Sequence, residues 1–150
     1  MKKPRIYVDT SVIGGCLDEE FAEDSNALLE MAKRGDAVLL VSDLLLDELR
    51  FAPPDVSAIL DSLPSNCIEV VKFSSEAYRL RDQYLAAGVV GPGSADDALH
   101  VALATLAGAD LLGSWNFKHI VHYDKVRKFN GVNLAEGYPL MDIVSPPEIV

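Results

Sequence analysis

Two carboxylate residues stand at places where a buried charge is unfavourable unless it has a partner. Asp9 directly follows the mostly apolar run at 5–8, which predicts a buried strand. Glu48 lies between Leu44 and Leu45 on a helical wheel, about 40° from Leu44 at about 100° per residue. Burying an unpaired carboxylate costs several kcal/mol, so both acids are candidate functional residues. The simpler alternatives are that Asp9 caps a short helix at 10–16 and that a distant Lys or Arg pairs with Glu48.

A third acid opens an almost wholly apolar helix predicted over 94–107. Asp97 shares a helical face with Val101 and Ala104, so it should point inward more than its neighbour Asp96. Acids are also expected in a first helical turn, and Ser94 with an acid three residues later resembles a capping box. The capping explanation accounts for one of the two acids, which leaves the other as a candidate.

If Asp9, Glu48 and Asp97 converge, their charges need a counterion. Two unit charges about 5 Å apart repel by about 3 kcal/mol at an effective dielectric constant of about 20. Oxygen ligands without thiolates or a histidine cluster favour Mg²⁺ or Mn²⁺ over zinc. His119 and His122 have the spacing of one helix face, but no further zinc-type ligand lies near them in sequence. A hard divalent ion held by carboxylates is typical of phosphodiester hydrolysis.

The segments that must position these acids alternate between short apolar runs and amphipathic stretches. Strands are predicted at 5–8, 37–41, 67–71, 109–113 and 141–144, and helices at 21–34, 42–50, 55–63, 74–87 and 94–107. Apolar strands separated by helices predict an α/β fold, with a central parallel sheet of four or five strands in a three-layer α/β/α arrangement. Such sheets bind ligands beyond the carboxyl ends of their strands, where Asp9, Ser42 and Ser114 stand.

Length and composition predict one soluble domain over residues 1–150. Hydrophobic residues make up 49% of the chain and charged residues 24%, which excludes disorder as the main state. No uncharged stretch approaches the about 20 residues of a membrane span, and no signal peptide is predicted. Two cysteines without CxxC spacing favour a reducing, cytoplasmic setting. A formal net charge of −10 excludes a broadly cationic nucleic-acid clamp.

Four blocks of sequence together resemble the PIN domain, in the branch of the bacterial VapC-type toxins. They are Val8–Ser11, Ser42 with Glu48–Leu49, Asp97–Ala104, and Ser114–His119. The resemblance covers nearly the whole chain, and the order and spacing of the blocks make it specific. It implies a parallel sheet between helices, Mg²⁺- or Mn²⁺-dependent endoribonuclease activity on RNA, and an antitoxin as partner. A homodimer is the general expectation for such proteins.

Carried over residue by residue, Asp9, Glu48 and Asp97 match the three family acids as catalytic residues and metal ligands. Asn116 stands where many members have a fourth acid. Its amide oxygen can coordinate a metal ion weakly but brings no charge, so this sequence departs from the family pattern there. The supporting polar residues expected around the acids are Thr10, Ser11, Asp96 and Ser114.

The densest basic stretch of the chain overlaps the fourth block and is interleaved with aromatic residues. Charge beside aromatic rings suits single-stranded RNA, whose bases stack on such rings. The alternative is an ordinary helix with one solvated and one apolar face. The predicted RNA-binding residues are Lys118, His119, Lys125, Arg127 and Lys128, and the interleaved aromatic residues are Trp115, Phe117, Tyr123 and Phe129.

Two other functions are weighed against the ribonuclease. A phosphoryl-accepting Asp9 of the haloacid-dehalogenase kind would need a second aspartate two residues later, where Ser11 stands. A non-catalytic PIN-like module that binds RNA or protein is favoured by Asn116 and by the net charge of −10. His100 is predicted to be a core histidine, hydrogen-bonded to the backbone or to an acid, rather than a catalytic residue.

Overall fold

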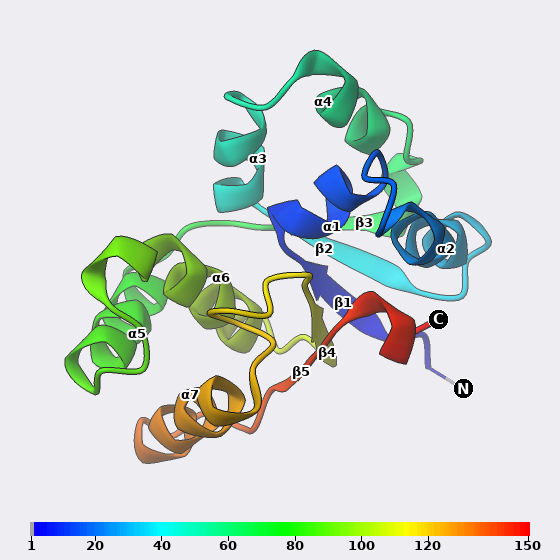
Figure 1. Cartoon of the computed structure of the whole chain (residues 1–150). Helices are drawn as coiled ribbons and strands as arrows, with labels where there is room; N and C mark the ends of the chain where they lie inside the picture. The colour runs from blue at the N-terminus through cyan, green and yellow to red at the C-terminus, as the bar shows by residue number, and fades with distance from the viewer. Residues whose placement is uncertain (1) are drawn as a thin grey trace.

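A five-stranded, fully parallel sheet forms the centre of the protein in a computed structural model that describes residues 2–150 (Figure 1). The strands are β1 (Arg5–Val8), β2 (Val38–Ser42), β3 (Ile68–Val71), β4 (Leu111–Gly113) and β5 (Asp142–Val144). Their order in the sheet is β3-β2-β1-β4-β5. The prediction of a parallel sheet with four or five strands is confirmed.

Helices cover both faces of this sheet. The α-helices are α1 (Thr10–Gly15), α2 (Ala22–Lys33), α3 (Asp43–Leu49), α4 (Pro54–Asp61), α5 (Ser75–Ala86), α6 (Ala95–Leu106) and α7 (Tyr123–Ala135), and the short 3₁₀ helices are η1 (Ser65–Cys67), η2 (Pro92–Ser94) and η3 (Pro146–Glu148). Helices α1 to α4 lie on one side of the sheet and α5 to α7 on the other (Figure 1). Among the described helices, none is long and apolar enough to cross a membrane.

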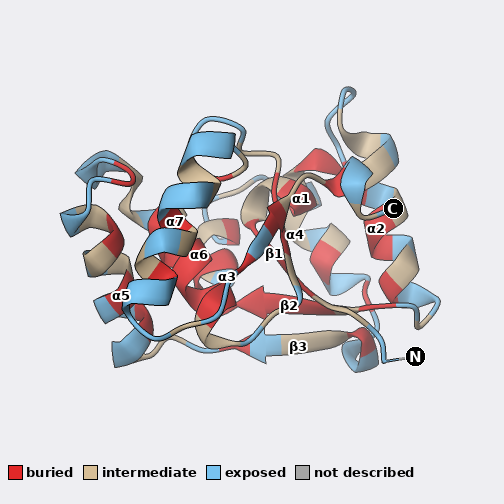
Figure 2. Cartoon of the chain, turned by 90° about the horizontal axis from the view of Figure 1, so that it is seen from below, coloured by how far each residue is buried: buried red, intermediate tan, exposed pale blue. Residues whose placement is uncertain are grey.

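Two apolar layers follow from the alternation of side chains along the strands. Tyr7 points into the layer shared with α5, α6 and α7, while Ile6 and Val8 on the same strand join the layer shared with α1 to α4. All three are fully buried. Figure 2 shows β2 buried along most of its length, whereas β3, at the sheet edge, is only partly covered.

Helix α6 is the most deeply buried of the three helices on its side, and it carries Asp97 at its first turn. Every residue from Ala98 to Thr105 is buried, as the apolar sequence of the segment predicts. The helix ends before Gly108, whose φ of +66° is a conformation that glycine adopts readily. The boundaries predicted from sequence are therefore close to those observed.

Three local predictions differ from the structure. The Ser94 side chain makes no capping hydrogen bond, because 92–94 form the 3₁₀ turn η2 and Ser94 is not in the extended conformation usual for a cap. His119 and His122 do not share a helix face, since α7 begins only at Tyr123. Asp9 precedes α1, but its carboxylate makes no capping bond to that helix.

Candidate active site

The first acid lies where the strand order reverses. Strands β1 and β4 are neighbours at this switch point, and ligands of open α/β sheets bind in the crevice beyond it. Asp9 follows β1 and Ser114 follows β4, and the Ser114 hydroxyl donates to Asp9 Oδ2 at 2.5 Å. The Ser11 hydroxyl donates to the other oxygen, Oδ1, at 2.6 Å. The two chain segments are thus joined through one carboxylate.

Asp9 is almost fully buried, with 4% of its surface exposed. Burial raises its pKa, while the positive potential of His100 and the hydroxyls of Ser11 and Ser114 lower it. The net shift is upward. Within residues 2–150, no Lys or Arg forms an ion pair with this carboxylate. Asp9 is therefore a buried acid whose charge is supported by His100 and by hydrogen bonds rather than by a Lys or Arg of residues 2–150.

Glu48 projects from α3, which begins where the sequence places its start. The Ser42 hydroxyl accepts from Leu45 N at 3.1 Å and so caps the helix. Glu48 Oε1 accepts from the Thr10 hydroxyl at 2.8 Å and lies 2.6 Å from His100 Nε2. Burial alone would raise the pKa of Glu48, but the bonds from His100 and Thr10 outweigh it, so that the pKa is lowered. Glu48 is the acid of the three that ionises most readily.

His100 is the site residue that sequence reasoning placed in the core without a role. Its ring is buried, with Nε2 against Glu48 and Nδ1 2.7 Å from the Tyr7 hydroxyl. The prediction of a core histidine bonded to an acid is confirmed, but its partner was not identified. One signal was available, because His100 follows Asp97 by three residues and shares its helical face.

Asp97 is the third acid and lies at the start of α6. Burial raises its pKa, His119 and His100 lower it, and the negative charges of Asp9 and Glu48 raise it further, with a net upward shift. The charges of Asp9 and Glu48 therefore both reach Asp97. Asp96, predicted as a supporting residue, is exposed on the same helix.

The acids do not form a ready-made metal cage. In the part of the chain that the structure describes, no group of three or more His, Cys, Asp or Glu side chains is placed to hold a metal ion. The chemistry of the donors nevertheless fits Mg²⁺ or Mn²⁺, because they are carboxylate oxygens and the charges of Asp9 and Glu48 act on Asp97. Among residues 2–150, His100 is the only basic side chain within ion-pair distance of any of the three. A bound ion would require the carboxylates to draw together.

Asn116, predicted as a fourth metal ligand, forms hydrogen bonds within the loop that follows β4. Its Oδ1 accepts from His119 N at 2.9 Å, and its N–H donates to Ser114 Oγ at 2.9 Å. These bonds shape the turn that follows β4 and place His119 close enough to Asp97 to lower its pKa. The amide therefore organises the loop around the acids.

Only part of the predicted RNA-binding stretch is free at the surface. Lys118 and Arg127 are exposed, and the Arg127 guanidinium lies over the Tyr123 ring. Lys125 donates to the Val89 carbonyl at 2.7 Å, and Lys128 pairs with a neighbouring acid of α7. Phe129 and Trp115 are not available for stacking on bases. Phe129 is fully buried in the core, and Trp115 is stacked on Phe21 with ring centroids 4.2 Å apart.

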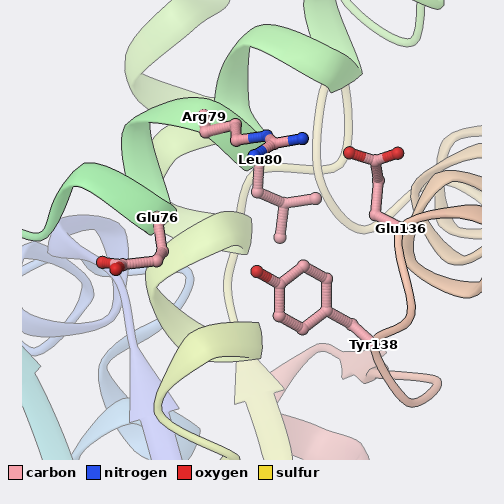
Figure 3. A pocket seen from close by; sticks show the side chains of 5 residues that line it. All are labelled: Glu76, Arg79, Leu80, Glu136 and Tyr138. Atoms are coloured by element: carbon pink, nitrogen blue, oxygen red, sulfur yellow. The ribbon is translucent and has the colours of Figure 1, made fainter.

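The surface is hollowed at two other places. A pocket of about 200 Å³ opens between α5 and the end of α7, where Arg79, Glu136 and Tyr138 line it (Figure 3). A wider, mostly apolar hollow of about 340 Å³ lies along β3 and α4, where Leu60 and Val70 line it. Neither hollow is lined by Asp9, Glu48 or Asp97.

Comparison with solved structures shows which fold this is. The chain matches VapBC2 from Rickettsia felis, bound to a DNA fragment from its promoter, with a TM-score of 0.60 and 15% identity over 94% of this chain and 98% of that one. The chain has the fold of the PIN-domain toxins. FitAcB from Neisseria gonorrhoeae matches with a TM-score of 0.57 and 16% identity over 94% of this chain and 97% of that one.

A third structure with this fold is VapC20 of Mycobacterium tuberculosis, a Sarcin-Ricin loop cleaving toxin. It matches with a TM-score of 0.51 and 18% identity, over 91% of this chain and 98% of that chain. No protein-family model and no curated protein matches the chain. The PIN fold predicted from four sequence blocks is thus confirmed by structure rather than by overall sequence similarity.

Proposed function

We propose that this protein is a metal-dependent endoribonuclease and the toxin of a toxin–antitoxin pair. The observation that carries the proposal is the buried carboxylate of Asp9 at the strand-order switch of a PIN fold, joined to Ser114 beyond β4. Asp97 lies near enough to Asp9 and Glu48 for their charges to raise its pKa. Acids with raised pKa values at the ligand-binding edge of a sheet, here Asp9 and Asp97, indicate a site selected for chemistry.

Each acid has its own part in the proposed site. Asp9 and Asp97 would hold a Mg²⁺ or Mn²⁺ ion, and Glu48 would hold it directly or through water. Such an ion neutralises charge on a phosphoryl group and activates water for attack on phosphorus. Ser11 and Ser114 keep Asp9 oriented, and each leaves its carboxylate oxygen with a further lone pair.

The proposed substrate is RNA, and the proposed partner is an antitoxin protein. Support for an RNA substrate comes from VapC20, named as cleaving the Sarcin-Ricin loop. Support for an antitoxin partner comes from VapBC2 and from FitAB, another structure that matches the chain; both are bound to DNA. Because the net charge is −10, RNA would have to approach along a locally basic face. Lys118 and Arg127, with the exposed rings of Phe117 and Tyr123, are the proposed contacts.

The test is Mn²⁺-dependent cleavage of a mixed pool of structured and single-stranded RNAs. Asp9→Asn should abolish cleavage, because it removes a ligand charge while both serines can still bond to the amide. Asp47→Asn is the matched control, since Asp47 lies beside Glu48 on α3 but pairs with Arg50 at the surface. Cleavage that survives in Asp9→Asn would come from a contaminating nuclease and would count against the proposal.

A second candidate is a PIN-like module that binds RNA or protein without cutting it. Asn116 favours this candidate, because it stands in place of a fourth acid and its oxygen is already used within the loop. RNA binding by the wild-type protein, without cleavage at any Mn²⁺ concentration, would support the module over the enzyme.

A further inference from the structure

The two carboxylate oxygens of Glu48 are in different situations. Both hydrogen-bonding neighbours reach the same atom, because the Thr10 hydroxyl and His100 Nε2 contact Oε1, at 2.8 Å and 2.6 Å. Oε2 has no hydrogen-bond partner among residues 2–150. About a third of the side chain is exposed, so the carboxylate is held on one side and open on the other.

His100 is itself held firmly in place. It is 3% exposed, and its Nδ1 lies 2.7 Å from the Tyr7 hydroxyl. The Tyr7 ring meets the imidazole edge-on, with centroids 5.8 Å apart. Neither ring can turn without breaking a buried contact, so the direction of Nε2 is fixed by the core of the protein.

The network closes on the helix from which it starts. Tyr7 donates to Ser42 Oγ at 2.8 Å, and Ser42 Oγ accepts from Leu45 N at the first turn of α3. Glu48 lies on the last turn of the same helix. A ring of hydrogen bonds thus runs from α3 through β2, β1 and α6 and back to α3. It ties the orientation of the carboxylate to the central strands of the sheet.

We propose that His100 is a positioning residue that, together with Thr10, fixes Oε1 of Glu48 and leaves Oε2 as the oxygen that meets the divalent cation. The inference rests on the proposed function, because it takes Glu48 to be a metal ligand. A glutamate side chain has several rotamers, and ordering them opposes metal binding unless the protein has ordered them beforehand. Outer partners of metal ligands act in this way, and their loss typically weakens metal binding about 10- to 100-fold.

The experiment measures Mn²⁺ binding to the whole chain from the loss of the electron paramagnetic resonance signal of free Mn²⁺. His100→Gln keeps an N–H near the position of Nε2, whereas His100→Asn keeps a polar group only near that of Nδ1. We expect His100→Asn to bind Mn²⁺ about 10-fold more weakly, and His100→Gln to stay within about 3-fold of wild type. His122→Asn, at an exposed histidine that makes no side-chain capping bond, should bind like wild type.

A second variant guards against a failure of folding. Thr10→Val removes the other bond to Oε1 from a half-buried position, and it should also weaken binding about 10-fold with little change in melting temperature. Equal binding by His100→Asn, Thr10→Val and wild type would overturn the positioning role. The same holds if His100→Gln, while folded, loses as much affinity as His100→Asn.

Failure of the proposed function gives a different result. Glu48→Gln keeps Oε1 as acceptor for Thr10 and His100 but replaces Oε2 by an amide nitrogen. If Glu48→Gln binds Mn²⁺ as well as wild type, or if wild type binds none, then Glu48 is not a metal ligand and the metal site itself is wrong. If Glu48→Gln binds Mn²⁺ weakly while His100→Asn binds it normally, Glu48 remains a metal ligand and only the positioning role of His100 is excluded.

Discussion

Replacing Ser114 by alanine tests the hydrogen bonds that hold Asp9. The Ser114 hydroxyl is fully buried, donates to Asp9 Oδ2 and accepts from Asn116 N. Alanine removes a bond to a carboxylate, worth about 1.5–3 kcal/mol, and a bond to a backbone amide, worth about 1 kcal/mol. We therefore expect the free energy of unfolding to fall by roughly 2–4 kcal/mol near neutral pH. For a chain of this size, that is a drop in Tm of roughly 5–15 °C.

The size of this loss should depend on pH, because Ser114 bonds to the ionised form of Asp9. Burial raises the pKa of Asp9 above its value in the unfolded chain. The stability due to this group is thus fully present below the unfolded pKa and is lost as pH rises through the folded pKa. The Ser114 hydroxyl lowers the folded pKa and limits that loss. Without it the pKa rises further, so the stability gap between variant and wild type should widen with increasing pH.

Urea unfolding followed by circular dichroism, at about pH 5 and about pH 8, measures both effects. Ser62→Ala is the matched control, because the exposed Ser62 hydroxyl bonds only to the Ile59 carbonyl on its own helix. It should change stability by less than about 0.5 kcal/mol. If Ser114→Ala is as stable as this control at both pH values, the Ser114 hydroxyl does not stabilise the Asp9 carboxylate.

Three further changes have defined outcomes. A Cβ added at Gly15 would lie 2.8 Å from Trp115 Nε1, so Gly15→Ala should lower the free energy of unfolding by about 1–3 kcal/mol in urea titration. Tyr84→Phe removes the buried bond to Asn133 Oδ1 and should lower Tm by an amount that corresponds to about 1–3 kcal/mol. Mn²⁺ should raise the Tm of wild type but not that of Asp97→Asn, because an ion stabilises only the fold that binds it; equal shifts would exclude Asp97 as a ligand.

The predictions that held depend on local periodicity. The position of Glu48 between Leu44 and Leu45 predicts that it lies on the inner face of α3, and both leucines are buried. Asp97 was expected to turn inward more than Asp96, and it does. These inferences need only the number of residues per turn, which the sequence contains.

What the sequence could not predict are the contacts between distant segments. His100 was predicted to be a core histidine, but its partners Glu48 and Tyr7 could not be named, because those contacts exist only once β1, α3 and α6 are assembled. Likewise, the hydrogen bond from Lys125 to the Val89 carbonyl forms only because the loop before α6 passes close to α7. Phe129 is predicted from sequence to stand among aromatic residues that stack on bases, but it lies on the face of α7 that packs into the core.

Trp115 is the only tryptophan of the chain, and it is linked to Asp9 through Ser11. Its backbone N–H donates to Ser11 Oγ at 2.9 Å, and the Ser11 hydroxyl in turn donates to Asp9. Its indole N–H donates to Ser25, and its ring lies against Phe21. The protein therefore contains a built-in fluorophore that is connected to Asp9 through two successive hydrogen bonds. Its fluorescence should register any rearrangement of that carboxylate without an attached dye.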